Sequence, residues 1–241
     1  MSYAENPYRA PVYGFAADAA VDERADFIRK TYLNLGGAVL AFAGLEAVLL
    51  NVPGLAESYT AALVQSRWGW AIVLGAFMLV SWLAESWARS SVSTATQYMG
   101  LSLYVTAEAV LFLPLLYFAN RIDQRVIPTA ALATGTIFIG LTAVVFLTRK
   151  DFSFLRTALW LGGFVAMVMI AASMIVGFSL GMVFSVAMVA FAGGYILYDT
   201  SNVLHHYRIG QHVAAALALF ASVALLFWYI VRIVLSFTSR D

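Results

Sequence analysis

Two acidic side chains lie where the sequence offers them no obvious contact with water. Asp199 ends the apolar run Phe178–Asp199, and no other residue of that run is charged. Glu108 lies near the middle of another apolar segment, Leu101–Asn120. A carboxylate is costly to place in hydrocarbon, so it either reaches water at the membrane surface or has a task in a hydrated protein interior. These two acids therefore indicate the movement or sensing of cations or protons.

Two further charged residues could take part in the same chemistry. Glu85 and Arg89 are four residues apart, which places them on one face of a helix that continues that far. They could form a surface pair that contributes a few tenths of a kcal/mol, or Arg89 could reach inward to an acid. For Glu108 two interpretations stay open: a neutral carboxyl group hydrogen-bonded across helices, or a side chain on an ion pathway. We expect Glu46, about one and a half turns from the end of its segment, to extend to the membrane interface.

Other residues that often do chemistry give weaker signals. His205, His206 and His212 follow Asp199 and could bind a metal or respond to pH. Their spacing matches no standard zinc motif, so we expect a solvated loop. Ser179 lies in a G-x-S-x-G pattern, which in serine hydrolases requires a strand-to-helix elbow. Here the pattern falls between two apolar segments, and we expect no enzyme. The absence of cysteine excludes disulfides and thiol catalysis.

The composition requires that these residues be positioned by membrane helices. The chain of 241 residues is 62% apolar and 11% charged, whereas a soluble domain has about a quarter charged residues. A membrane helix needs about 20 apolar residues, and seven segments meet this length. They are Tyr32–Val52, Trp68–Ala88, Leu101–Asn120, Ile127–Thr148, Leu155–Val176, Phe178–Tyr198 and Val213–Phe237. Short connections predict one antiparallel bundle over residues 32–241, preceded by a tail of residues 1–31 whose stretch Asp22–Lys30 begins a helix.

The distribution of basic residues predicts the orientation of this bundle. With the N-terminus inside, the inner group of loops holds nine Lys and Arg residues and the outer group holds three. The inner residues are Arg9, Arg24, Arg29, Lys30, Arg89, Arg149, Lys150, Arg156 and Arg208; the outer ones are Arg67, Arg121 and Arg125. This bias favours a cytosolic N-terminal tail. A net charge of +1 gives no case for a nucleic-acid partner.

Four segments of the chain resemble the Bax inhibitor family, the transmembrane BAX inhibitor motif proteins. The segments are Arg24–Tyr32, Gln97–Glu108, Phe191–Thr200 and Ala215–Arg232. The likeness extends from about residue 24 to the C-terminus, and the run Phe191–Thr200 is similar to the most recognisable motif of the family. The resemblance implies a seven-helix bundle in which the last helix lies centrally among the other six.

The resemblance also implies a function for the region of Asp199. In family members with the full motif, two aspartates form a hydrogen-bonded pair that senses pH and gates a slow calcium leak. One aspartate corresponds to Asp199, and Arg89 is the candidate for an arginine that can bond the pair. Ser222 takes the position of the second aspartate. Serine cannot supply a second carboxylate, although it can donate a hydrogen bond to an ionised Asp199. A calcium site there would also lose a formal charge.

Two hypotheses of different classes follow from these observations. The first is a cation leak channel gated at Asp199 and Ser222, with Glu108, Arg89 and Glu85 along or beside the pathway. It needs no cofactor beyond a transient Ca²⁺ ion, for which Asp199 is the candidate ligand. The second is a regulatory protein without transport that acts on membrane proteases or stress responses through partner contacts. For both we expect a monomer in the lipid bilayer of a bacterial inner membrane, with Ca²⁺ and H⁺ as the cations of the first.

Overall fold

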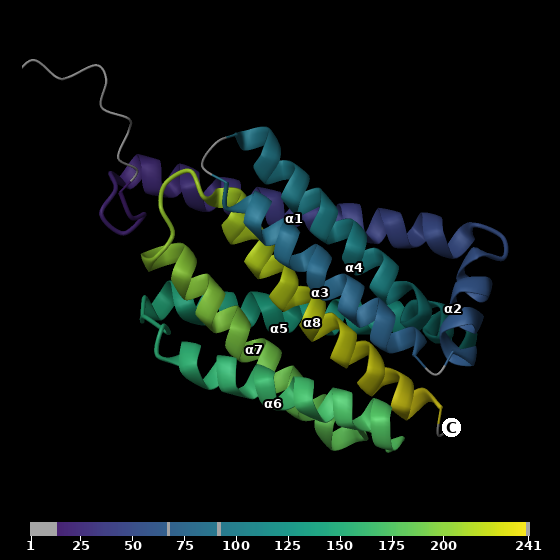
Figure 1. The fold of residues 1–241 in the computed structure, drawn as a ribbon. Helices are drawn as coiled ribbons and strands as arrows, with labels where there is room; N and C mark the ends of the chain where they lie inside the picture. Colours follow the sequence, from purple (N-terminus) through teal and green to yellow (C-terminus); the bar gives the residue numbers. More distant parts are fainter. Residues whose placement is uncertain (1–13, 67, 91–92, 240–241) are drawn as a thin grey trace, which may run out of the picture.

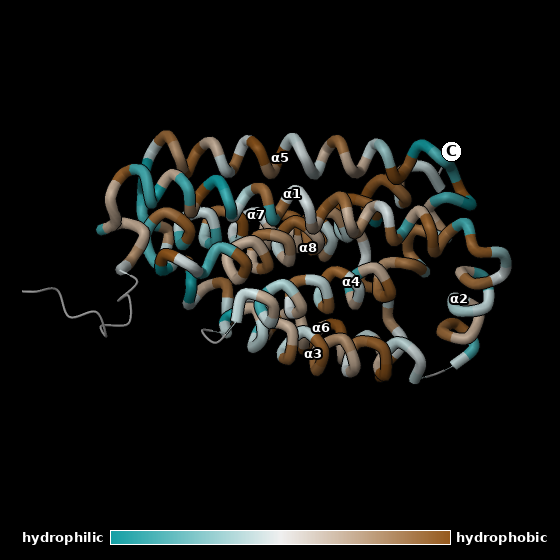
Figure 2. The backbone as a smooth tube through the Cα atoms, turned by 90° about the horizontal axis from the view of Figure 1, so that it is seen from above, coloured by the Kyte–Doolittle hydropathy of each residue, from teal (hydrophilic) through white to brown (hydrophobic). Residues whose placement is uncertain are grey.

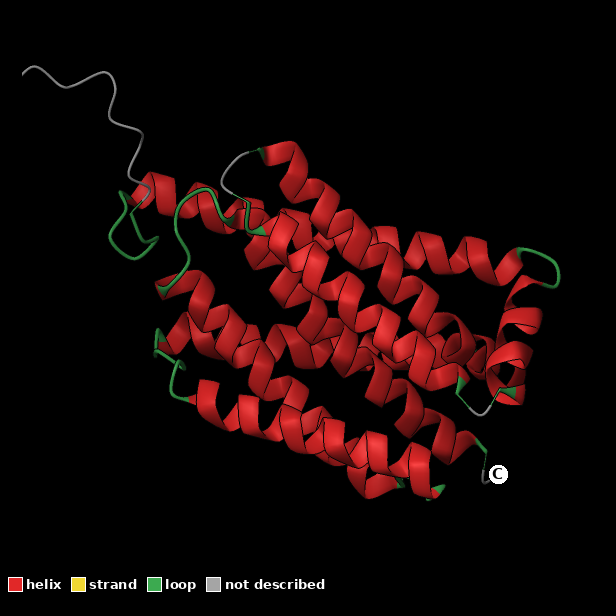
Figure 3. Cartoon of the chain, in the orientation of Figure 1, coloured by secondary structure: helices red, strands yellow, loops and turns green. Residues whose placement is uncertain are grey.

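The computed structural model describes residues 14–66, 68–90 and 93–239, and within these ranges it contains eight α-helices and no β-strand (Figure 3). The helices are α1 (Val21–Asn51), α2 (Leu55–Gln65), α3 (Gly69–Ala88), α4 (Thr94–Ile122), α5 (Val126–Thr148), α6 (Leu155–Val176), α7 (Met182–His205) and α8 (His212–Thr238). All but α2 are long and apolar enough to cross a membrane. The predicted fold class, an all-α membrane protein with seven spanning helices, is confirmed.

The helix α8 lies in the middle of the bundle. It packs against α1, α3, α4, α5 and α7, and both views show it enclosed between them (Figures 1 and 2). The protein itself buries 72% of the apolar part of α8, compared with 11% for α3 and α6. Lipid-facing helices can expose apolar side chains at no cost, whereas a central helix must satisfy its polar atoms within the protein. The polar residues of α8 therefore need partners on its neighbours.

The end of α7 differs from the prediction in a way that affects the site. The predicted sixth span ends at Tyr198, but α7 continues to His205, so Asp199 lies inside the helix and not at its end. Between α6 and α7 the chain makes a short turn at Gly177, whose φ of 85° favours glycine. At the N-terminus, α1 begins at Val21 and includes Asp22–Lys30, as expected. The first 13 residues of the predicted tail lie outside the described residues.

Close backbone packing fixes α3 against α4. A Cβ atom on Gly100 would lie 2.5 Å from the carbonyl oxygen of Ala84 and 2.6 Å from the amide nitrogen of Ala88. Only glycine allows this approach, which is typical of interfaces between membrane helices. The contact positions the C-terminal end of α3, which carries Glu85 and Arg89, beside the start of α4.

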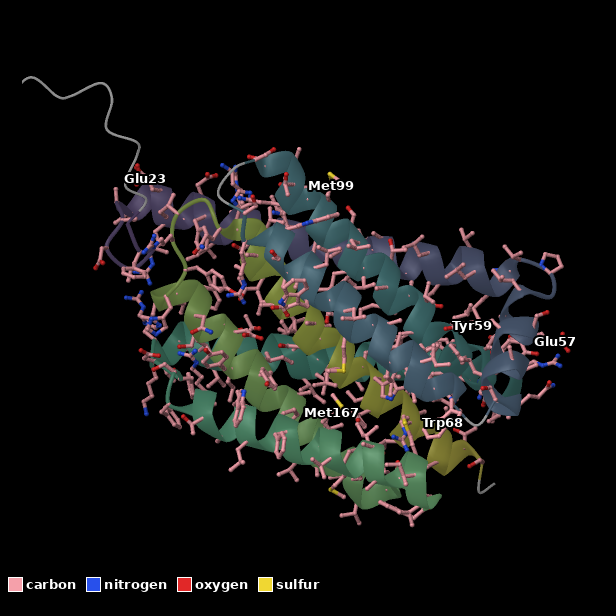
Figure 4. The ribbon with its side chains drawn as sticks, in the orientation of Figure 1. Glu23, Glu57, Tyr59, Trp68, Met99 and Met167 are labelled. Carbon is pink, nitrogen blue, oxygen red and sulfur yellow. The ribbon has the colours of Figure 1, made fainter. Side chains whose placement is uncertain are left out.

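The two ends of the bundle are polar and its middle is apolar (Figure 2). Glu23 and Glu57 lie at opposite ends (Figure 4). We call the end that holds the C-terminus of α3, the C-terminus of α7 and the start of α8 the Asp199 end. This end also holds the start of α1 and the link between α5 and α6. Its basic residues include Arg89, Arg149, Lys150, Arg156 and Arg208. Arg9 and Arg67, which the orientation also used, lie outside the described residues.

Candidate functional site

A hydrogen bond joins Asp199 of α7 to Ser222 of α8. The Ser222 hydroxyl donates to Asp199 Oδ2 over 2.5 Å. Both residues are buried, with 7% of Asp199 and 4% of Ser222 exposed. A buried carboxylate without a donor would carry a large desolvation cost, so this bond stabilises the pairing of α7 with α8. Ser222 is thus the neighbour of Asp199 that the resemblance implied, while the functional role of either residue stays a prediction.

A small pocket lies beside this bond at the Asp199 end. It is formed by Glu85, Ala88, Arg89, Ala214, Leu217 and Ala218. Within it, Arg89 Nη2 lies 3.9 Å from Glu85 Oε2, and both side chains are more than half exposed. Asp199 lies within electrostatic reach of Glu85 and Arg89. Glu85 and Arg89 therefore form the expected i,i+4 pair at the surface, and their charges also act on Asp199.

A much larger cavity of about 590 Å³ lies on the other side of Ser222. Side chains of α3, α4, α6, α7 and α8 form its wall, and Ser222 and Glu108 are among them. Most of the wall is apolar. The described part of the chain thus brings three predicted site residues, Glu85, Arg89 and Ser222, around Asp199. The remaining one, Glu108, lines the same cavity as Ser222.

Glu108 is buried in the wall of this large cavity, with 6% of the residue exposed. The polar group beside it is the hydroxyl of Tyr104, one turn earlier on the same helix. Among the described residues, no side chain of another helix forms a hydrogen bond with Glu108, so the first interpretation of this residue, a bond across helices, gains no support. Its position on a cavity wall agrees with the second.

Glu46 does not extend to the membrane interface, and that expectation was wrong. Only 4% of the residue is exposed, and neither carboxylate oxygen has a hydrogen-bond partner among the described residues. Glu46 continues the buried stripe of α1, which runs at helical spacing through Phe27, Leu35 and Phe42. This stripe packs on α4 and α8, so the helix phase directs Glu46 inward.

The N-terminal segment covers the Asp199 end. The amide of Ala16 donates to the carbonyl of Tyr207 over 2.8 Å, and the amide of Ile209 donates to the carbonyl of Gly14 over 3.2 Å. Arg24 adds a hydrogen bond from Nη2 to the carbonyl of Leu204 at the end of α7, over 3.3 Å. Burial raises the pKa of the Tyr207 phenol, and the charge of Asp199 raises it further. The sequence pattern did not predict this contact between the N-terminal segment and the end of α7. Arg24 nevertheless belongs to the segment Arg24–Tyr32, which carries part of the family resemblance.

The loop between α5 and α6 makes a second contact with the end of α7. The amide of Phe152 donates to Ser201 Oγ over 2.9 Å, and His206 Nε2 lies 3.0 Å from Asp151 Oδ2. The backbone amide of Ser153 donates to Asp151 and lowers the pKa of its carboxyl group. His205 Nδ1 instead lies 3.0 Å from the carbonyl of Ser201. The described residues therefore contain no group of three potential metal ligands.

Ser179 is far from the histidines that could serve as its base. It lies exposed in the link between α6 and α7, at the end of the bundle opposite His205 and His206. The 24 residues of α7 separate the link from these histidines by about 36 Å at 1.5 Å per residue. Among the described residues, the G-x-S-x-G pattern therefore lies in a link between two helices, without a strand-to-helix elbow and without a histidine beside Ser179.

The family follows from a match that covers most of the chain. Residues 24–240 match the family described as inhibitor of apoptosis-promoting Bax1. The chain belongs to this Bax inhibitor family. This confirms the resemblance drawn from the four motifs.

Relatives of this Bax inhibitor family member include several bacterial proteins. The protein PA2604 of Pseudomonas aeruginosa is 29% identical over 219 residues, which cover 90% of this chain and 92% of that protein. NMA0420 of Neisseria meningitidis is 26% identical over 234 residues, covering 95% and 98% of the two chains. The modulator of FtsH protease YccA of Escherichia coli is 32% identical over 117 residues, which cover 48% of this chain and 52% of YccA.

We predict that Ser222→Ala destabilises the protein by about 1–3 kcal/mol, because Asp199 Oδ2 loses its buried donor. Thermal unfolding in detergent, followed by circular dichroism, measures the change. Ser236→Ala is the matched control, since the Ser236 hydroxyl bonds to the carbonyl of Ile233 on the same helix and leaves no buried charge behind. Equal unfolding midpoints for Ser222→Ala and Ser236→Ala would show that the hydrogen bond between Asp199 and Ser222 contributes nothing to stability.

Proposed function

We propose that this Bax inhibitor family member is a cation leak protein in which the bond between Asp199 and Ser222 closes the pathway. The observation that carries the proposal is the position of this bond. On one side lies the small pocket with Glu85 and Arg89, and on the other lies the large cavity with Glu108. Both spaces are lined by α3 and α8, so under this proposal a cation passes from one space to the other along α8, past Asp199 and Ser222.

One face of α8 supports this pathway. Ala214 and Ala218 line the small pocket, and Ser222, Leu225 and Arg232 line the large cavity. These residues follow one another at intervals of three, four or seven, which places them on one side of the helix. A small separation of α8 from α7 at Ser222 would therefore join the two spaces along a continuous surface.

The acids along this surface favour cations over anions. Glu85, Asp199 and Glu108 stand at the small pocket, at the bond and at the large cavity respectively. Carboxylate oxygens are the ligands that Ca²⁺ prefers, and its affinity rises with the number of charged ligands. Because Ser222 replaces a second carboxylate, Asp199 would hold Ca²⁺ only transiently, and H⁺ is the second candidate ion.

Flux through liposomes that contain the purified protein tests the leak. We expect calcium or proton flux above that of empty liposomes. Ser222→Ala should raise the rate about tenfold, the population shift that corresponds to losing one hydrogen bond to a charged group. Ser236→Ala should leave it unchanged. If the wild type and Asp199→Asn both leave calcium and proton flux at the empty-liposome level, the leak is excluded.

We further propose that the protein lies in the inner membrane with the Asp199 end facing the cytosol. The excess of basic residues at that end supports this orientation, and a relative of Escherichia coli bears the name inner membrane protein YccA. A protease added to intact spheroplasts should cleave a tag at the C-terminus and leave a tag at the N-terminus intact. The reverse pattern would contradict the orientation.

A second candidate function is regulation of a membrane protease. The similarity to YccA, whose name describes it as a modulator of FtsH protease, favours it. Under this proposal, FtsH of the same organism should be captured with the protein from solubilised membranes, and deleting the protein should change the turnover of an FtsH substrate. The Asp199→Asn variant should behave as the wild type in this assay if regulation does not need ion flux. Unchanged turnover in the deletion strain, without capture of FtsH, would exclude it.

A further inference from the structure

We propose that the large cavity binds an acyl chain of an anionic phospholipid whose phosphate is held by Arg232. This inference concerns the cavity between Ser222 and Arg232, and it does not depend on the leak. It rests on the composition of the cavity, on its depth and on the charge at its mouth.

The cavity has the size and lining of a site for an apolar ligand. Its volume of about 590 Å³ falls within the range of about 300–1,000 Å³ that is usual for ligand sites. Leu74, Met78, Met167 and Leu225 are among the apolar side chains of its wall. The helices α3 and α6 contribute opposite walls and lie on either side of α8 (Figure 1). Methionine suits a flexible chain because its own side chain adapts in shape.

The depth of the cavity matches one leaflet of a bilayer. Along α8 the wall extends from Arg232 to Ser222, ten residues that span about 15 Å at 1.5 Å per residue. Half of a hydrocarbon core of about 30 Å is also about 15 Å. Trp70 and Leu180 line the cavity near the end opposite Asp199, and Met167 lies about midway along the bundle (Figure 4). A chain that enters from the leaflet remote from Asp199 would reach Ser222 with its methyl end.

Arg232 supplies the charge that selects the headgroup. It lines the cavity six residues before the end of α8, and its guanidinium carbon lies 5.8 Å from the centre of the Tyr229 ring. Among the described residues it forms no ion pair with a carboxylate. A guanidinium group binds phosphate oxygens in a bidentate manner, and the long arginine side chain reaches the interface from within a helix. The other charged residue of the wall, Glu108, lies near the middle of α4.

The proposal is tested by native mass spectrometry of the whole protein after exchange into nanodiscs with equal amounts of phosphatidylglycerol and phosphatidylcholine. We expect one retained phosphatidylglycerol per protein, favoured about fivefold, the effect of one basic residue on one anionic headgroup. Arg232→Gln should abolish the preference and Arg232→Lys should restore part of it. Arg121→Gln is the matched control, because Arg121 also lies near a tyrosine ring, 5.7 Å from that of Tyr117, but outside the cavity.

A second pair of variants tests the chain-binding part. Ala166→Phe fills the cavity from α6 and should reduce retention of both lipids, whereas Val165→Phe, whose residue is half exposed and outside the wall, should not. Equal retention of the two lipids by the wild type would overturn the proposal, as would a preference that survives Arg232→Gln. Retention of a free fatty acid in place of a phospholipid, or equal retention by the two phenylalanine variants, would overturn it as well.

Discussion

An acid inside a membrane protein must find a partner within the protein, and Asp199 finds it in Ser222. This constraint places α8 beside α7 in the interior of the bundle, although most of the side chains of α8 are apolar. The Ser222 hydroxyl must face α7, and the remaining surface of α8 is then covered by α1, α3, α4 and α5. The outer helices α5 and α6 have no comparable requirement and expose most of their apolar surface, as lipid allows. The bond thus sets the rotation of α8, and α8 organises the bundle.

The same rotation places one face of α8 along two spaces that differ in character. The small pocket is bordered by the exposed charges of Glu85 and Arg89, and the N-terminal segment covers the same end of the bundle through Tyr207. The large cavity is mainly apolar and ends at Arg232. A lipid chain in the large cavity would fill the volume that a cation needs beyond Ser222. Lipid binding in this cavity and cation flux through it would therefore oppose each other.

Much of the fold could be predicted from apolar run lengths, because a bilayer imposes one length on every spanning helix. The short helix α2 was missed, since Leu55–Gln65 is too short to span, although its buried residues Ala56, Thr60 and Leu63 recur at helical spacing. The apolar run predicts that α7 ends at Tyr198, because the charged Asp199 follows, whereas the helix continues to His205. Run length cannot show that Asp199 has a partner 23 residues away on another helix.

Within the site, the pairing of Asp199 with Ser222 could be predicted only through the family motifs. The prediction for Glu46 was wrong for a different reason. Its distance from the end of the segment indicated the interface, whereas the spacing of Phe42 and Leu35 on the same helix would have indicated burial. The large cavity left no signal in the sequence, because it depends on how five helices separated along the chain converge.

Because the chain contains no cysteine, substituted cysteines can measure directly whether the bond separates the two spaces. Ala218→Cys reports on the small pocket and Leu225→Cys on the large cavity. A membrane-impermeant thiol reagent applied from the Asp199 end should modify the cysteine at position 218 but not that at 225. Adding Asp199→Ala should make position 225 reactive from the same side. Equal reactivity at position 225 with and without Asp199 would contradict the central claim that the Asp199–Ser222 bond closes the path.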